Sequence, residues 1–492
     1  YERKFLLWHE FPILDLPDEI LALIFHFVVR SATGADEIDN RRLYLTWVCG
    51  RFRAVSLSDA TLWSSVWFRQ SVPWERSFIY IQRAGTAALD IRIQERIRSK
   101  DSTHENPPKN PPITVMQIKN LLEVLKPRVR QLRTLKVFLV NIEVVEAFMD
   151  GFSNLAGPLA ALENITIHRS GQPFLWPKEK CAGAGGHLAF STHPIPKLRI
   201  LWLYGVTTNW NAVPFSNLSM IILRRIAFEG CPTSDRWMEM LRASPRLLKL
   251  ELDGAGPQFD PKSQRLGHTR PVDLPALRDL TIGNMSCHEV MHVLGQINAE
   301  HVRILVLVSL TTHDYGHLIG MLGGRFREVR LLKLHGLEIA KTDLNTERTV
   351  RWFESMPRLK VFAFWRTSPH VLNALLADPR DYRASGEQDK RPAAGGGDKR
   401  PVLCPELETV RFYAQAQKDV HILAKGRKDL GVMLKRAYTS AESGITQEEA
   451  TRLRESVGQL LEASQRMIVT PDEESVYRER VGKSCVATEK AA

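Results

Sequence analysis

The sequence predicts an α+α/β fold, in which a three-helix module precedes an irregular solenoid of short parallel strands with helices outside. Three observations predict it. Apolar residues follow helical spacing in the first seventy residues, a Leu-x-x-Leu-x-Leu unit recurs ten times after residue 130, and helix-like runs separate the units. With 492 residues the chain is also too long for one ordinary core.

The first helix is expected to begin at Pro17, because proline has no N–H to satisfy in a first helical turn. Asp18 and Glu19 then place negative charge near the positive end of the helix dipole. Apolar residues follow at helical spacing, namely Ile20, Leu21, Ile24, Phe25 and Val28. A second amphipathic run carries Leu45, Val48, Cys49 and Phe52, and a third short segment holds Leu62 and Trp63.

The repeated unit alternates apolar positions with variable ones, as a short strand does. The ten units begin at Leu132, Leu162, Leu198, Leu218, Leu247, Leu277, Val302, Val329, Leu359 and Leu407. One strand and one helix cannot bury their own apolar face, but stacked units can. Most spacings between units lie near the roughly 20–29-residue period of leucine-rich repeats, which the array resembles. The alternative is a generic α/β domain with chance leucine spacing.

The N-terminal residues resemble an F-box. The resemblance rests on three motifs in order: Leu16-Pro17-x-Glu19-Ile20-Leu21-x-x-Ile24-Phe25, then Val48-Cys49-x-x-Phe52-Arg53, then Leu62-Trp63. The segment between Val29 and Leu43 is longer than in compact F-boxes and is similar to inserts of fungal F-box families. The alternative is a plain helical cap on the solenoid.

The resemblance implies a partner, the Skp-type adaptor of a cullin-RING ubiquitin ligase. It also implies the adaptor-binding residues, which are Leu16, Pro17, Ile20, Leu21, Ile24, Val48, Cys49, Phe52 and Trp63. Some of these side chains must instead fill the core of the module.

Four regions are expected along the chain. Residues 11–70 form the helical module, 71–129 a connecting segment with a Pro-rich linker, 130–425 the solenoid, and 426–492 a C-terminal helical segment with a polar tail. Residues 381–402 are rich in Gly and charge and are expected to be a disordered insertion.

The substrate-binding side chains are expected on one face of the stacked strands. The third, fifth and seventh positions of each unit point away from the core. The face contains Phe138, Trp202, Tyr204, His335, Trp365 and Tyr413, which are the candidate substrate-binding residues. Ile304, Val306 and Val308 share the face and are very apolar for free surface, so a second possibility is that another segment, such as the C-terminal helix, covers it.

Residues 288–298, HEVMHVLGQIN, contain the HExxH pattern of zinc proteases. The third metzincin ligand should fall at residue 298, which is Asn298. On a helical wheel, His288 and His292 lie roughly opposite the apolar face, so they are expected to face solvent. The sequence therefore predicts a solenoid helix here, with no metal site, no catalytic residue and no cofactor.

Composition narrows the remaining function classes. The net charge is +12, but no block of five or six consecutive basic residues occurs, so a nucleic-acid partner is not favoured. No apolar stretch reaches about 18 residues, which predicts no membrane span. The six cysteines form no CxxC pair, which favours reduced thiols and a cytoplasmic or nuclear location.

The leading hypothesis is a substrate-recognition subunit of an SCF-type cullin-RING E3 ubiquitin ligase that is not itself an enzyme. The F-box would bind the adaptor, and the repeats would bind an unknown protein substrate. The alternative is a leucine-rich-repeat interaction scaffold without a ligase role, and a zinc metalloprotease using HEVMH is a distant third.

Overall fold

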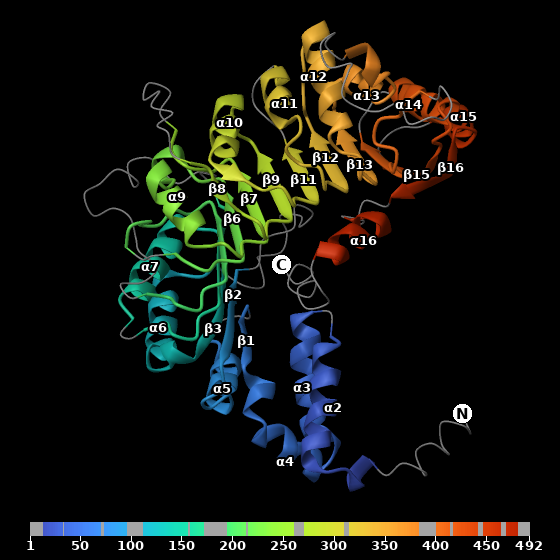
Figure 1. The fold of residues 1–492 in the computed structure, drawn as a ribbon. Coiled ribbons are helices and arrows are strands. Elements are labelled where there is room, and N and C mark those ends of the chain that lie inside the picture. Colours follow the sequence, from blue (N-terminus) through green and yellow to red (C-terminus); the bar gives the residue numbers. More distant parts are fainter. Residues whose placement is uncertain are drawn as a thin grey trace, which may run out of the picture. The chain divides into compact units, whose positions relative to one another are not determined.

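The chain divides into two compact units, Tyr1–Phe215 and Ser216–Lys490, which are described separately (Figure 1). A computed structural model describes residues 13–32, 34–69, 73–95, 112–155, 158–171, 194–212, 215–259, 270–308, 314–382, 400–413, 417–440, 446–463 and 469–480. Most of the expected insertion 381–402 and the Pro-rich stretch up to residue 111 lie outside these ranges.

Between Ile13 and Trp63, the described residues of the first unit form three α-helices with a short 3-10 turn at each end. The elements are η1 (Ile13–Asp15), α2 (Asp18–Arg30), α3 (Ala35–Val48), α4 (Gly50–Ser58) and η2 (Ala60–Trp63). The sequence predicted one amphipathic run through Leu45, Val48, Cys49 and Phe52, and this prediction is wrong because α3 ends at Val48 and α4 begins at Gly50. Cys49 is extended, with φ −161° and ψ 172°, and its Sγ accepts a hydrogen bond from the Phe52 N–H, so a new helix begins there.

Repeats begin earlier in the first unit than the sequence indicated. The elements that follow are β1 (Ser65–Phe68), α5 (Glu75–Arg83), β2 (Leu89–Gln94), α6 (Val115–Leu125), η3 (Lys126–Gln131), β3 (Leu132–Leu139), α7 (Ile142–Ser153), β4 (Asn164–Arg169) and β5 (Ile200–Tyr204). Neighbouring strands from β1 to β5 pair in parallel. The expectation that residues 71–129 form a connecting segment is therefore corrected, because these residues contain α5, β2 and α6. Its strand, LDIRIQ, alternates in burial but lacks the leucine signature of the later units.

The second unit continues the same strand–helix pattern. Its elements are β6 (Met220–Arg224), η4 (Phe228–Gly230), α9 (Ser234–Arg242), β7 (Lys249–Asp253), β8 (Val272–Asp273), β9 (Asp279–Gly283), α10 (Cys287–Gly295), β10 (Ile297–Asn298), β11 (Ile304–Val308), α11 (Gly316–Leu322), β12 (Leu331–His335), α12 (Asp343–Glu354), β13 (Val361–Trp365), α13 (Pro369–Ala374), η5 (Pro379–Tyr382), β14 (Thr409–Tyr413), α14 (Gln417–Asp429), β15 (Leu434–Ser440), α15 (Gln447–Arg454), β16 (Val457–Ala463) and α16 (Pro471–Arg480). Successive strands pair in parallel, and β8 and β10 form a separate pair.

The solenoid also extends further than residue 425. β15 and β16 add two strands, so the helical run expected after residue 445 is wrong beyond Arg454. The spacing of Leu453, Val457 and Leu460 suits a helix, but a short apolar run cannot be assigned by periodicity alone. Here the unpaired edge of β15 supplies the backbone partners that make Val457–Ala463 a strand.

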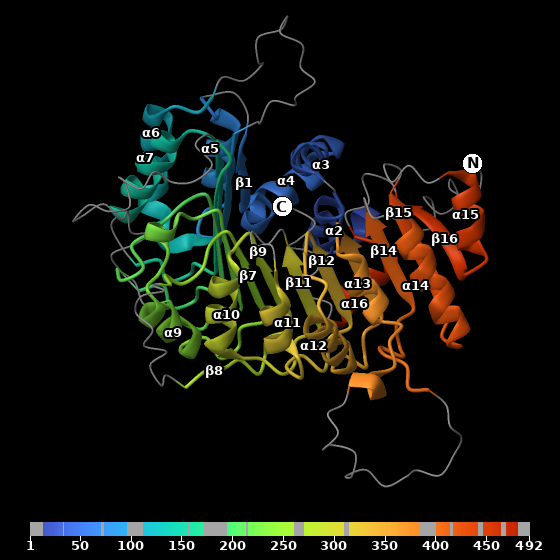
Figure 2. The same cartoon turned by 90° about the horizontal axis from the view of Figure 1, so that it is seen from above.

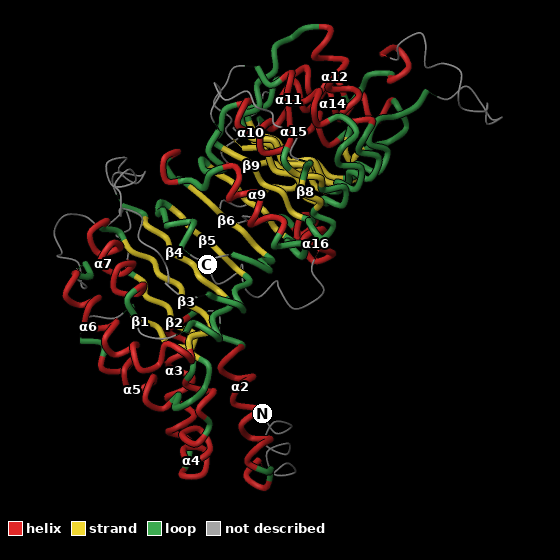
Figure 3. Tube along the Cα trace, turned by 60° about the vertical axis from the view of Figure 1, so that its left-hand side comes forward, coloured by secondary structure: helices red, strands yellow, loops and turns green. Residues whose placement is uncertain are grey.

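All ten Leu-x-x-Leu-x-Leu units are strands, as the sequence predicted. The fourth and sixth positions of every unit are at most 1% exposed, as in Leu305 and Leu307 or Phe362 and Phe364. In each of the two compact units, the helices that connect successive strands lie on one face of those strands (Figures 1 and 2), and the short strands lie in parallel rows (Figure 3). The leucine pattern is therefore the core pattern of the solenoid.

Two smaller expectations concern thiols and membranes. Cys49, Cys231, Cys287 and Cys404 are free, whereas Cys181 and Cys485 lie outside the described residues. Across the described ranges, no helix has the length and apolar character that crossing a bilayer requires.

Candidate functional site

Helices α2 and α3 expose an unusual number of large apolar side chains. The two helices pack beside each other (Figure 1). Each carries exposed apolar residues at helical spacing. The exposed side chains, with their exposed fractions, are Ile20 42%, Leu23 55%, Phe27 75%, Val28 37%, Tyr44 57%, Trp47 66% and Val48 61%. We call these residues the apolar face. Clustered apolar exposure of this kind marks an interaction surface more often than chance.

The structure divides the predicted adaptor-binding residues into core and surface. Leu21, Phe52 and Trp63 are at most 8% exposed, so they fill the core of the module, and their assignment as contacts is corrected. Pro17, Ile20 and Val48 are exposed, while Leu16, Ile24 and Cys49 are half-buried. Leu23, Phe27, Tyr44 and Trp47 were not expected. The sequence carried a signal for the two residues on α2, because Leu23 and Phe27 widen the apolar stripe of that helix beyond what one buried face needs.

Ion pairs fix the start of α2 against α4. The Arg51 guanidinium lies 2.7 Å from Asp18 Oδ1 and donates to the Leu16 carbonyl at 2.6 Å. At the other end of the module, His26 Nε2 lies 2.9 Å from Asp59 Oδ2. These contacts orient the Leu16–Pro17 turn and the exposed side of α2 together.

The helical module also packs on the first repeat. The Trp63 indole N–H donates to the Ser56 carbonyl at 2.7 Å, and its ring contacts Tyr80 of α5 at 5.1 Å between centroids. Arg42 of α3, which is 2% exposed, donates to the Ser65 carbonyl at the start of β1 at 2.8 Å. The module is therefore continuous with the solenoid and not separated from it by a linker.

The inner face, defined as the strand face opposite the helices, carries an aromatic strip in the first unit. Phe138, His168 and Tyr204 are neighbours in register on β3, β4 and β5. Their rings meet at 5.6 Å and 4.1 Å between centroids. The Arg92 guanidinium carbon lies 4.4 Å from the Phe138 ring centroid, and burial lowers the pKa of Arg92. Two predicted substrate residues thus belong to one half-buried strip, with Trp202 on the same strand as Tyr204.

In the second unit, α16 covers the inner face of β11–β13. Val476 of that helix packs in a buried cluster with Ile304, Val306, Leu331 and Val361 of β11–β13, against which Val308 and Tyr477 also pack. The possibility raised by the apolar strand positions is therefore confirmed here: the C-terminal segment covers them. His335 and Trp365 stay half-buried, with ring centroids 6.2 Å apart, and the Tyr413 side chain lies outside the described residues.

Charges on α16 meet opposite charges on the strands beneath. Glu473 is fully buried; its Oε1 lies 2.8 Å from Lys333 Nζ, and its Oε2 accepts from Arg411 at 2.6 Å. Asp472 pairs with Arg436 and accepts from the Tyr438 hydroxyl at 3.0 Å. Burial alone would raise the pKa of Glu473, but Lys333 and Arg411 outweigh it and hold that pKa below its usual range.

Two neutral groups on this face respond to the same environment. Burial, together with the Lys333 ammonium, lowers the pKa of His335 to about 4. Burial and the Asp472 carboxylate raise the pKa of Tyr438 to about 12. Both side chains are therefore neutral at pH 7, and the positive charge that pairs with α16 comes from Lys333, Arg411 and Arg436.

The HEVMH segment forms α10. Val290, Val293, Leu294 and Ile297 are buried, as the wheel predicted. His288 is exposed, but His292 is half-buried, which corrects its expected solvent position: its Nε2 bonds to Ser234 Oγ and to Gln296 Nε2, both at 2.9 Å. Glu289 caps its own helix through the Ser286 N–H at 2.7 Å. Within the described residues, no group of three or more His, Cys, Asp or Glu side chains could hold a metal ion.

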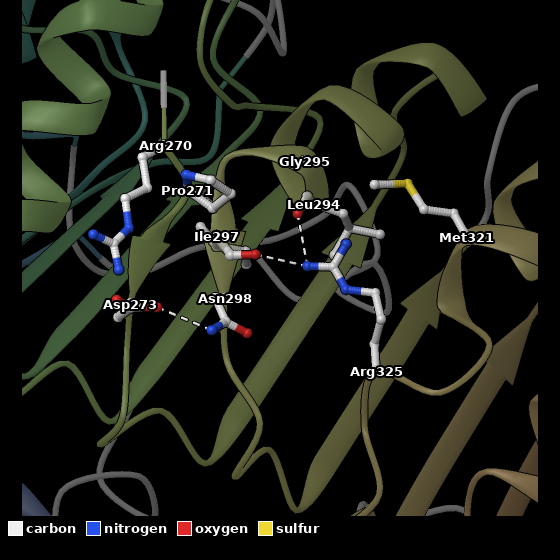
Figure 4. Close-up of a pocket in the computed structure, with 9 residues that line it drawn as sticks. All are labelled: Arg270, Pro271, Asp273, Leu294, Gly295, Ile297, Asn298, Met321 and Arg325. Carbon is white, nitrogen blue, oxygen red and sulfur yellow. Dashed lines mark hydrogen bonds between the residues drawn. The ribbon is translucent and has the colours of Figure 1, made fainter. Parts of the chain in front are cut away.

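A pocket of about 550 Å³ lies beside α10 (Figure 4). It is lined by Arg270, Pro271, Asp273, Leu294, Gly295, Ile297, Asn298, Met321 and Arg325. Arg325 donates to the Leu294 and Ile297 carbonyls at 2.8 and 2.6 Å, and Asn298 donates to Asp273 at 2.9 Å. Arg325, Asn298 and Asp273 are thus held by hydrogen bonds within the pocket lining, which includes no nucleophile paired with a base.

No protein-family model matches the chain, and no curated protein matches it. Among solved structures, the chain is similar to one in the crystal structure of the Rad7 and Elc1 complex in yeast. The similarity covers 93% of this chain and 90% of that one, at 12% identity and a TM-score of 0.34.

Proposed function

We propose that this chain is the substrate-recognition subunit of an SCF-type cullin-RING E3 ubiquitin ligase. The α2–α4 module binds a Skp-type adaptor, and the inner face of the repeats binds a protein substrate. The chain performs no chemistry itself; it holds the substrate near the ubiquitin-conjugating enzyme.

The observation that carries the proposal is the apolar face. It lies in the same fifty residues as the LPxE, Val-Cys-x-x-Phe and Leu-Trp motifs of the F-box resemblance. Covering one large apolar side chain at an interface stabilises the complex by roughly 1.5–3 kcal/mol. Seven such side chains on two adjacent helices, each at least 37% exposed, could support a specific complex.

The test is adaptor binding by the full chain, measured by calorimetry with a purified Skp-type adaptor. Replacing Leu23 and Phe27 together with Ser removes about 3 kcal/mol or more of burial, so the affinity should fall at least about 100-fold. The matched control is the double change Phe228→Ser and Leu344→Ser in the second unit, whose side chains are 45% and 54% exposed. That variant should bind the adaptor like the wild type.

A scaffold without a ligase role is the second candidate. The observation that favours it is the packing of Trp63 and Arg42 against the first repeat, which a helical cap also requires. If the wild-type chain binds no Skp-type adaptor at micromolar concentration, or if the control variant loses binding as the test variant does, the scaffold becomes the better interpretation.

A further inference from the structure

The charge pairs beneath α16 define a ligand chemistry. We propose that the inner face of β11–β15 is a binding site for an acidic helical segment of a partner protein, and that α16 occupies this site in cis. Assigning that partner as a ubiquitination substrate rests on the proposed function, whereas the binding itself does not.

One half of the site selects for carboxylates. Lys333 on β12, Arg411 on β14 and Arg436 on β15 lie on successive or near-successive strands of the same face. They receive the adjacent carboxylates Asp472 and Glu473, and the Glu473 side chain is buried to 0% exposure. Desolvated, charge-assisted hydrogen bonds of this kind are the strong ones, so they discriminate strongly against a neutral residue.

The other half selects for apolar side chains one helical turn further on. Ile304, Leu331 and Val361 form a floor that Val476 fills, and Tyr477 packs beside it with Lys333 Nζ 5.5 Å from its ring centroid. The recognised pattern is therefore Asp-Glu followed after two residues by an apolar and an aromatic residue. An aliphatic floor next to three cations fits an acidic amphipathic helix better than the uniform charge of a nucleic acid.

The strands of the same unit differ in how their charges are neutralised. On β6 and β7, Arg224 pairs with Glu251, and Lys249 lies 3.5 Å from Glu251 and 3.6 Å from Asp279, all on the strands themselves. On β12, β14 and β15, the carboxylates that pair with Lys333, Arg411 and Arg436 come from α16. The strand cations thus meet a separate element that another chain could supply.

Exchange of α16 for a partner would leave no charge buried without a counter-charge. When the helix leaves, Lys333 and Arg411 face water on an open sheet, and Glu473 leaves with the helix. A helix as short as Pro471–Arg480 is also marginal by itself, so part of its docking free energy is spent on ordering it. A partner helix that is already ordered avoids that cost and can compete.

The experiment uses the full chain and a fluorescein-labelled peptide of residues 469–480, read by fluorescence anisotropy. In an opened variant, Glu473→Gln with Val476→Ser, cis docking is weakened, and the peptide should bind at least about tenfold tighter than to the wild type. Adding Lys333→Ala and Arg411→Ala to the opened variant should abolish this gain. Adding Lys249→Ala instead is the matched control and should leave it intact.

A neutral peptide with Asn and Gln at positions 472 and 473 should bind at least about tenfold more weakly than the acidic one. Equal binding of both peptides, or no binding by an opened variant with wild-type circular dichroism, would overturn the proposal. Tighter binding of a single-stranded oligothymidine than of the acidic peptide would overturn it in favour of a nucleic-acid site. All these measurements omit the adaptor, so their failure is distinguishable from loss of adaptor binding.

A second measurement covers the case in which the opened variant does not fold. Hydrogen exchange of residues 471–480 is followed in the wild-type chain, with and without excess acidic peptide. Faster exchange of α16 with the peptide, and not with its neutral version, supports displacement. If α16 exchanges as slowly as strands β12 and β13 in both conditions, it is a fixed part of the core and the proposal is wrong.

Discussion

Helices α2 and α3 expose Leu23, Phe27 and Trp47 to solvent, whereas α16 covers Leu331 and Val361 on the strands of the second unit. The first surface is apolar and open; the second is partly charged and occupied. An open apolar surface indicates that a partner binds, but says little about its sequence. An occupied surface is more informative, because the cis helix displays the side chains that fit it.

The difference also separates two sources of binding free energy. On the apolar face, affinity comes mainly from burying area, at about 25 cal/mol per Å², and depends weakly on pH. Under α16 it comes partly from buried ion pairs, whose net worth depends on desolvation and on protonation. Changes that test one source should leave the other unaffected.

The largest expected effect separates core from surface within the helical module. Trp63→Ala should lower the free energy of unfolding of the first unit by about 3–5 kcal/mol, because a fully buried indole is lost. Trp47→Ala, at a ring that is 66% exposed, should change it by less than about 0.5 kcal/mol while weakening adaptor binding. Urea unfolding followed by tryptophan fluorescence measures both. If Trp47→Ala destabilises the fold as Trp63→Ala does, the apolar face is part of the core.

A smaller effect concerns acid sensitivity of the charged surface. The pKa of His335 is lowered to about 4 by burial and by Lys333 and Arg411, with Glu473 acting in the opposite sense. Between the unfolded value near 6.5 and the folded value, only the unfolded chain binds the proton, so stability falls as pH drops through this window. We expect His335→Gln to remove roughly 1–3 kcal/mol of this loss in the second unit.

Calorimetric melting at pH 7 and pH 4.5 measures the effect, and the variant should lose less stability than the wild type over that step. The Glu473 contribution has the same sign, but it is lost at lower pH, because its folded pKa lies below the ordinary glutamate value. Equal pH dependence in the wild type and the variant would show that His335 is accessible to protons and that α16 does not shield it.

The sequence predicted the solenoid more completely than the surfaces. The apolar positions of the Leu-x-x-Leu-x-Leu unit are the positions that become buried, so core residues such as Leu305 and Leu332 were located correctly. β1, β2, β15 and β16 were missed because their sequences, SVWF, LDIRIQ, LKRAYTS and VGQLLEA, do not follow the Leu-x-x-Leu-x-Leu pattern. At the apolar face, helical spacing could not tell which of Leu21 and Leu23 is buried, since that depends on where α3 packs. The pairing of Glu473 with Arg411, 62 residues apart, carried no local signal at all.

The smallest expected effects are at the two histidines of α10, of which His288 is exposed and His292 is half-buried. His288→Ala should change the free energy of unfolding by less than about 0.5 kcal/mol, because the ring is exposed. His292→Ala removes hydrogen bonds to Ser234 and Gln296 and a ring contact with Phe259 at 5.0 Å, so it should cost about 1 kcal/mol.

Added Zn²⁺ should leave the melting temperature of the wild type unchanged, since Glu289 is engaged in the helix cap and burial already lowers the pKa of His292 without a metal. A zinc-dependent rise in melting temperature that His288→Ala abolishes would contradict this and would revive a metal site on α10.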